Sequence, residues 1–187
     1  KVVPQGAPIE LKMATYFDAP NTRSTSIEVK GMVAQKEVFD GDKGGSKTMN
    51  QSGGHDIAEL DQEEIEEKKI MNAFLPEMGL MSGKVDYSLL GIDAVNDKEY
   101  YVIEYSIGKT TTKAFYNTIT FMKEMTESLE ITEEGPQNVS AKFSDFSAVK
   151  GILFPHTVSQ MVGPAVLDAT VKVINLNVKI DPKKFQL

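Results

Sequence analysis

The fold is decided by the segment Val139-Ser-Ala-Lys-Phe143-Ser-Asp-Phe146-Ser-Ala-Val149-Lys150-Gly151-Ile152-Leu-Phe154-Pro155-His156 and its continuation to Val162. Apolar residues at 139, 141 and 143 alternate with polar ones, which is typical of a strand with one buried and one solvated face. Lys150-Gly151 supplies a turn, because glycine tolerates positive φ. A returning strand begins at Ile152, and Pro155 fits it only where the ladder does not need an N–H. The segment therefore predicts a β-hairpin.

The residues before this hairpin predict further antiparallel strands. Apolar and polar residues alternate around residues 9–13 and 25–29, and Ala19-Pro20-Asn21 separates these two strands. Val38-Phe39 leads into Asp40-Gly-Asp-Lys-Gly44, which is a strong signal for a tight turn. A meander of hairpins is the most economical interpretation of this half of the chain.

The second half of the chain also reads as strands. Asn96-Asp97-Lys98 predicts a hairpin turn, and Tyr101, Ile103, Tyr105 and Ile107 predict that the odd-numbered side chains of the following strand form its apolar face. In the last strand the apolar positions are odd up to Val173 and even from Ile174. A strand changes its buried face only with an extra residue, so we expect a β-bulge or sharp bend near Val173-Ile174.

One convincing helix interrupts the strands, beginning at Asp61 and ending before Pro76. Asp61 and Glu64 have the spacing of a capping box, and Leu60 and Ile65 have that of a hydrophobic staple. The second half of the helix is apolar in many directions, so we expect that end to be buried on most sides.

Together these elements predict an α+β, mainly β fold. The consecutive hairpins and the twist of β-sheets lead us to expect one curved antiparallel sheet of about ten strands, an unclosed half-barrel wrapped on the single helix. With 187 residues and no internal repeat, the chain is expected to form one domain over 1–187.

Composition excludes several classes of function. The 20 Lys and Arg residues against 27 Asp and Glu give a net charge of −7, which repels phosphate backbones, so no nucleic-acid partner is expected. No apolar run approaches the length of a transmembrane helix. The chain has no cysteine, which excludes disulfides, thiolate metal sites and cysteine nucleophiles.

Candidate chemical sites are weak. The turn that begins at Asp40 lacks two ligands of a calcium loop, including the bidentate Glu, and Ser46 stands where a phosphate-binding loop needs glycine, so an exposed hairpin turn is the better interpretation. The two histidines, His55 and His156, have no metal-ligand spacing. We therefore predict no catalytic residue, no metal, no cofactor and no enzymatic activity.

One cluster favours binding. Methionine is flexible and polarizable, and it suits surfaces that adapt to varied apolar ligands. Such residues gather at the helix end and its exit, and the candidate ligand-binding residues there are Met71, Phe74, Leu75, Met78 and Met81. Ordinary core packing explains the same residues, and the sequence alone favours that explanation.

Several segments taken together resemble the bacterial lipoprotein-carrier-like half-barrel domains. The chain resembles most the non-catalytic C-terminal domain of insulinase-family zinc peptidase-like proteins of the Bacteroidetes type. The matching landmarks are the run 35–44, the acidic helix from Asp61, Gly91 with the run 95–100, the segment 143–155, Ser159-Gln160-Met161, and the run 175–178 with Phe185. The sequence departs from the family at Phe121, which stands where the family turn has glycine, and a bulky residue takes positive φ only at a cost.

This resemblance implies a periplasmic or cell-envelope location and a concave face that shelters a lipid, an acyl chain or a lipoprotein from water. It also implies an alternative role as an accessory domain, acting in assembly or substrate positioning behind upstream peptidase-like domains. The family domain has a helix and a first strand that would precede Lys1. No zinc-peptidase motif is present in this chain, so the peptidase activity is not expected to transfer.

Overall fold

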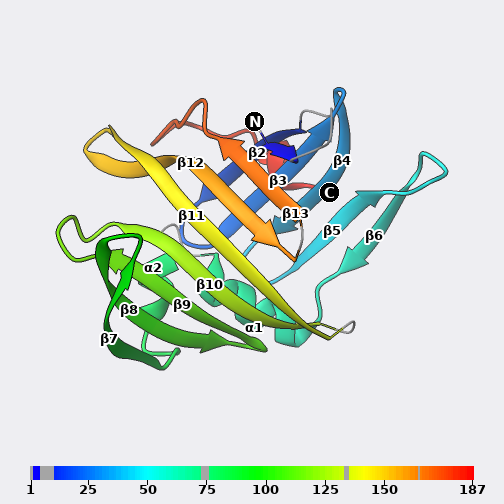
Figure 1. Ribbon diagram of the computed structural model, residues 1–187. Coiled ribbons are helices and arrows are strands. Elements are labelled where there is room, and N and C mark those ends of the chain that lie inside the picture. The colour runs from blue at the N-terminus through cyan, green and yellow to red at the C-terminus, as the bar shows by residue number, and fades with distance from the viewer. Residues whose placement is uncertain (1, 5–10, 73–75, 133–134, 164) are drawn as a thin grey trace. The chain divides into compact units, whose positions relative to one another are not determined.

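The computed structural model describes residues 2–4, 11–72, 76–132, 135–163 and 165–187, and these form an antiparallel, mainly β fold (Figure 1). The chain divides into two compact units. Unit 1 comprises Lys1–Pro8 and Val85–Leu176, and unit 2 comprises Ile9–Lys84 and Asn177–Leu187. The predicted fold class is confirmed: the sheets are antiparallel and unclosed, and α1 is the one helix longer than five residues in the described chain.

Unit 2 is a five-stranded meander in which every strand pairs with the next one along the chain, in the order β6-β5-β4-β3-β2. Its elements are β2 (Leu11–Asp18), β3 (Thr22–Val29), β4 (Met32–Phe39), β5 (Gly44–Met49), β6 (His55–Glu59), α1 (Gln62–Met71), α2 (Pro76–Leu80) and a C-terminal 3₁₀-helix, η1 (Pro182–Phe185). The predicted turns at Ala19-Pro20-Asn21 and after Asp40 both connect strands of this meander.

Unit 1 is a second meander, in the order β13-β12-β11-β10-β9-β8-β7, with β1 beside β13. Its strands are β1 (Val2–Pro4), β7 (Tyr87–Val95), β8 (Lys98–Ile107), β9 (Thr110–Asn117), β10 (Lys123–Thr132), β11 (Gly135–Val149), β12 (Ile152–Val162) and β13 (Ala165–Thr170). The hairpin predicted from 139–162 is confirmed as β11 and β12. Its turn holds Lys150 and Gly151 at φ 50° and 87°, and Pro155 lies opposite Phe146.

The buried face of β8 is not the predicted one. Tyr100 and Val102 are buried with Phe115 and Met125, and the register places Val102 opposite Phe115 and Phe115 opposite Met125. The odd-numbered Tyr101, Ile103 and Tyr105 are only half-buried, and of the four residues predicted for the apolar face Ile107 alone is buried. The prediction was wrong because both faces of β8 carry large apolar side chains, and periodicity cannot rank them.

The last strand is shorter than predicted. β13 ends at Thr170, and residues 171–181 form neither strand nor helix, so no strand passes Val173-Ile174 and the expected bulge there is wrong. The ladder with β12 ends at the pair Thr157–Thr170, and the Val171 N–H makes one more bond, to the His156 carbonyl. Alternation alone cannot sustain a strand that has lost its partner.

Helix α1 has the predicted N-terminus. The Asp61 carboxylate accepts from the Glu64 N–H at 2.9 Å, and the Glu64 side chain accepts from the Asp61 N–H at 2.8 Å, which completes the capping box. The expected burial of the helix end does not hold for Met71, which is 50% exposed, and Ala73, Phe74 and Leu75, which make up the rest of that end, lie outside the described residues. Among the described residues, no helix is both long and apolar enough to cross a membrane.

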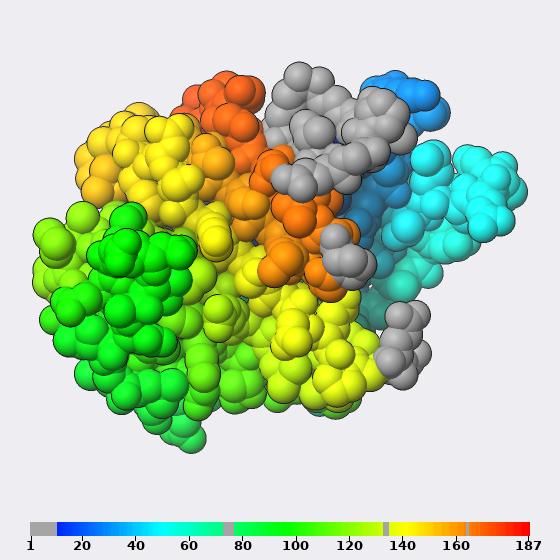
Figure 2. Space-filling model, in the orientation of Figure 1, coloured from blue at the N-terminus to red at the C-terminus, as the bar shows by residue number. Residues whose placement is uncertain are grey.

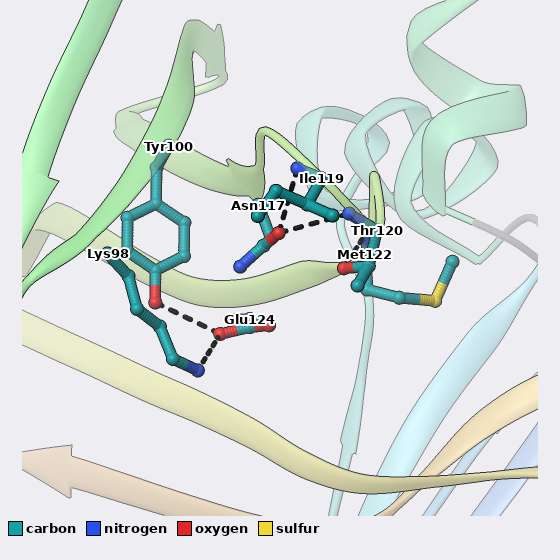
Figure 3. Close-up of polar contacts among 7 residues, drawn as sticks. All are labelled: Lys98, Tyr100, Asn117, Ile119, Thr120, Met122 and Glu124. Atoms are coloured by element: carbon teal, nitrogen blue, oxygen red, sulfur yellow. Dashed lines mark hydrogen bonds and ion pairs between the residues drawn. The ribbon is translucent and has the colours of Figure 1, made fainter.

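The turn from β9 to β10 takes the strained conformation that the sequence argued against (Figure 3). Phe121 has φ 58°. Asn117 organises the turn, because its side-chain oxygen accepts from the N–H groups of Ile119 and Thr120 at 2.9 and 3.0 Å. The Phe121 ring stacks on Tyr101, with centroids 6.3 Å apart and planes within 4° of parallel. This contact offsets part of the backbone cost.

Beside this turn, Lys98, Tyr100 and Glu124 form a polar cluster (Figure 3). The Glu124 carboxylate accepts from Lys98 at 2.9 Å and from the Tyr100 hydroxyl at 3.0 Å. Desolvation, followed by the bond to Glu124, raises the pKa of Tyr100. The cluster gives the hydroxyl of a buried core residue its partner, and it joins β8 to β10 across β9.

Candidate ligand site

Unit 2 contains a pocket of about 540 Å³ at the end of the β4–β5 hairpin. Its apolar lining comes from the sheet, from the start of α1 and from the C-terminal segment: Val38, Leu60, Ile65, Phe185 and Leu187. Asp40, Lys43 and Glu59 supply its charged groups. Because its lining combines apolar side chains with a few charged groups, this open pocket is the candidate ligand site of unit 2.

Two glycines make room for this arrangement. A Cβ on Gly44 would lie 2.5 Å from Leu60 Cδ1 and 2.8 Å from the Val38 carbonyl oxygen. On Gly45 it would lie 2.6 Å from the Ala58 carbonyl oxygen and 3.1 Å from Leu187 Cδ1. The start of β5 therefore has to be glycine for Leu60 and Leu187 to pack closely over it. In the sequence, Gly44 indicates only a tight turn.

Polar contacts hold helix α1 against the sheet of unit 2. Lys68 Nζ lies 2.5 Å from Glu37 Oε1 on β4, and both side chains are partly buried. Burial lowers the pKa of the neighbouring Arg23, while the Glu37 charge opposes that shift. The Leu60 N–H donates to the Gly44 carbonyl at 3.0 Å, which ties the start of the helix to β5. Ile65, the staple residue predicted from sequence, is thereby fixed in the pocket lining.

Asp40 makes a pH-dependent contribution to the stability of the folded protein. Its Oδ1 accepts from the N–H groups of Asp42 and Lys43 at 2.9 and 2.8 Å, and these bonds lower the pKa of the Asp40 carboxyl. A carboxyl with a lowered pKa in the folded state stabilises the fold above its unfolded-state pKa, and this contribution is lost as the pH falls through the folded-state pKa.

We therefore expect Asp40→Asn, which keeps an acceptor oxygen but removes the charge, to be less stable than the wild type at pH 7. The two proteins should converge in acid below the native pKa of Asp40. Urea unfolding midpoints measured between pH 7 and pH 2.5 would show this. A difference that stays constant over the whole range would contradict the assignment.

The methionines predicted as ligand contacts lie at the surface. Met71, Met78 and Met81 are 50%, 60% and 80% exposed, on α1, on α2 and just after α2. Phe74 and Leu75 lie outside the described residues. Side chains this exposed are not packed in a core, so ordinary core packing does not explain these three methionines. Their role as ligand contacts stays a prediction.

A second apolar surface lies in unit 1, at the sheet edge formed by β7. The register shifts between Leu89 and Gly91, and this bulge keeps Tyr87, Leu89 and Ile92 on one face, opposite Tyr105, Ile103 and Tyr101 respectively. Tyr87, Leu89 and Ile92 are 58%, 64% and 60% exposed. In Figure 2 the green segment, which contains β7 and β8, lies at the surface of the molecule.

The described residues give no support to metal or nucleophile chemistry. No group of three or more His, Asp or Glu side chains in them could hold a metal ion. Ser147 Oγ lies 2.9 Å from His156 Nδ1, but the same nitrogen lies 3.1 Å from the Phe154 carbonyl oxygen on the exposed end of the hairpin. Among the described residues, His156 has no hydrogen bond to a carboxylate that would orient it as a general base.

Sequence reasoning missed most of the pocket residues. Phe185 and Leu187 come from the C-terminal segment, at least 120 residues along the chain from the other lining residues. The Asp181-Pro182 pair did carry a signal, because Asp at the cap and Pro in the first turn begin a helix. Asp181 indeed caps η1 by accepting from the Lys183 N–H at 3.0 Å. No local pattern showed where this helix packs.

Comparison with known proteins bears on the fold. No family model matches the sequence, and no curated protein matches it. Among solved structures, a domain of Vibrio parahaemolyticus named for outer membrane lipoprotein sorting has a TM-score of 0.65 at 7% identity, over 99% of this chain and 86% of that one. The chain has a LolA-like fold.

Two further structures agree with this likeness. A LolA superfamily protein from Nitrosomonas europaea has a TM-score of 0.50 at 13% identity, over 93% of this chain and 86% of that one. A DUF1329 family protein from Desulfovibrio piger has a TM-score of 0.58 at 9% identity, over 99% and 85% of the two chains. None of the three is named for an insulinase-family peptidase, so that finer resemblance stays a prediction.

Proposed function

We propose that this protein is a non-enzymatic carrier of the bacterial periplasm or cell envelope, binding a hydrophobic ligand or the acyl chains of a lipidated partner. The observation that carries the proposal is the LolA-like fold, matched over 99% of the chain by a domain named for lipoprotein sorting. The exposed methionines and the apolar pocket of unit 2 support it, because both offer apolar surface to a ligand.

The proposed ligand contacts are those predicted from sequence: Met71, Phe74, Leu75, Met78 and Met81. An unbranched thioether side chain can repack around acyl chains of different length, which a branched side chain does less well. A carrier has to release its cargo, so adaptable contacts serve it better than a rigid complementary pocket.

The test is binding of a fluorescent diacylated lipopeptide, with the same peptide lacking its acyl chains as the control ligand. We expect saturable binding of the acylated form only. The triple variant Met71→Ser, Met78→Ser, Met81→Ser should bind it about tenfold or more weakly, because it removes apolar contact area worth at least about 1.4 kcal/mol.

Met32→Ser is the matched control, since Met32 is a 57% exposed methionine on β4 that the proposal leaves out of the site. It should bind the lipopeptide as the wild type does. Equal binding of the acylated and bare peptides would contradict the proposed function, and equal affinities of the triple variant and the wild type would remove the methionines from the site.

A further inference from the structure

Three lysines of unit 2 lie together without compensating charges. Lys36 on β4 and Lys47 on β5 are directly opposite in the ladder. Lys36 Nζ donates to the carbonyl of Gln186, two residues from Lys184, and burial followed by the charges of Lys184 and Lys47 lowers the pKa of the Lys36 ammonium. Within the described residues, none of the three forms an ion pair with a carboxylate. Like charges directly opposite on a sheet are destabilising, and this chain has a net charge of −7.

The lysines share a sheet face with the apolar pocket. Side chains two residues apart on a strand point to the same side, so Lys36 is on the face of Val38 and Lys47 is on the face of Gly45. Val38 and Gly45 are themselves paired, and both line the pocket. Two facing lysines are thus placed at the border of a pocket whose lining is apolar apart from Asp40, Lys43 and Glu59, and an amphiphile with an anionic head would meet cations at that border.

A buried hydroxyl continues this face. Ser24 on β3 pairs with Val38, and it is 1% exposed. Its Oγ has no hydrogen-bond partner. An unpaired buried hydroxyl costs free energy, and a ligand oxygen reaching this row of the sheet could relieve that cost.

The C-terminal segment already occupies the site in the way an amphiphile would. Phe185 and Leu187 place apolar side chains in the pocket lining, and the carbonyl oxygen of Gln186, between them, accepts a hydrogen bond from Lys36 Nζ. Lys184 lies over the Tyr16 ring, 5.2 Å from its centroid. The segment therefore supplies one apolar group on each side of a single oxygen acceptor for the lysine cluster.

We infer that this face of unit 2 binds an alkyl chain with an anionic head group, the head on Lys36 and Lys47 and the chain in the pocket, in competition with the C-terminal segment. The inference rests on the proposed function and gives a ligand class to the pocket, whose lining residues differ from the proposed methionine contacts. A carboxylate or a phosphate head satisfies the same cations. The ligand replaces the Gln186 carbonyl at Lys36 and the side chains of Phe185 and Leu187 in the pocket.

The C-terminal segment is only partly covered where it lies. Leu187 is 43% exposed in its seat, and residues 171–181, which tether η1, have no regular secondary structure. The cation that holds Gln186 is itself repelled by two neighbours. A ligand that competes with a segment of the chain binds with an affinity reduced to the extent that the segment fills the site.

The test uses the full chain and two fluorescent probes, cis-parinaric acid and its uncharged methyl ester. The wild type should bind the acid at least about tenfold more tightly than the ester. Lys36→Met and Lys47→Met should each lower the affinity for the acid about tenfold and leave that for the ester unchanged. Lys12→Met is the matched control, because Lys12 already faces Glu28 at 3.8 Å, and it should have no effect.

The double variant Phe185→Ser, Leu187→Ser tests the competition. It should bind both probes several-fold more tightly than the wild type, because the segment no longer fills the pocket. Lysophosphatidylglycerol, which has a phosphate head, should displace cis-parinaric acid if phosphate is accepted, and failure to displace it would restrict the site to carboxylates. Far-UV circular dichroism checks that each variant folds. If the double variant does not fold, the lysine variants decide the inference.

Equal binding of acid and ester, or weaker binding by a folded double variant, would overturn the inference. If the lipopeptide binds but the two parinaric probes bind alike in every variant, the carrier function stands and the anionic site is wrong. If neither the lipopeptide nor parinaric acid binds saturably, the proposed function fails and the inference fails with it.

Discussion

Replacing Phe39 by alanine is expected to lower the free energy of unfolding by about 3–5 kcal/mol, the usual loss when a buried aromatic side chain is truncated. Phe39 is 1% exposed and is the largest fully buried side chain among the described residues. It ends β4, and its ring lies 3.1 Å from the position of a Cβ on Gly44, beside Leu60. A cavity there would loosen β5 and the start of α1 together.

Urea unfolding followed by far-UV circular dichroism measures this loss. Met32→Ala is the matched control on the same strand, since Met32 is 57% exposed, and it should change the free energy of unfolding by no more than about 0.5 kcal/mol. Phe39→Ala should also lose binding of parinaric acid, because Leu60, which lies beside Phe39, and Ile65 line the pocket. Equal losses from the two substitutions would contradict the placement of Phe39 in the core of unit 2.

Replacing Gly79 by alanine is expected to destabilise the protein by about 1–3 kcal/mol, as overpacking does. Gly79 lies in α2, where alanine would ordinarily be the better residue. Here a Cβ would lie 2.2 Å from the Ile70 carbonyl oxygen and 3.1 Å from the Ile70 carbonyl carbon. These are backbone atoms of α1, so the two helices would have to move apart.

Gly54→Ala is the control, because a Cβ there meets only the Asn50 side chain, at 3.4 Å or more. It should change the urea midpoint little. The contact between α1 and α2 positions the exposed Met71 and Met78. Because Gly79→Ala disturbs this contact, it should also weaken lipopeptide binding. An unchanged or raised midpoint for Gly79→Ala would show that α2 does not pack on α1 as described.

The parts of the fold that were predictable are those encoded locally. The hairpin of β11 and β12 follows from alternation and from Lys150-Gly151, and the capping box at Asp61 follows from residue spacing. Asn96 and Asp97 hold positive φ in the turn between β7 and β8, as the Asn-Asp-Lys signal indicated. In each case the residues that make the contact are close together in the sequence.

The features that were missed depend on partners distant in the sequence. Residues 171–181 alternate as a strand would, but the β12 ladder available to them ends at Thr157. Phe121 takes positive φ because Asn117 and Tyr101 hold the turn, which a rule about single residues cannot anticipate. The pocket depends on Phe185 and Leu187 reaching the sheet from the far end of the chain. Local periodicity contains no information about such contacts.

A transfer assay tests most directly whether the protein carries an acylated cargo. The protein is mixed with phospholipid vesicles that contain a fluorescent diacylated lipopeptide, and the vesicles are then removed by centrifugation. We expect the lipopeptide to appear in the supernatant in a saturable one-to-one complex with the protein, and to be released again by excess vesicles. Lipopeptide that stays with the vesicles at every protein concentration would contradict the proposed function.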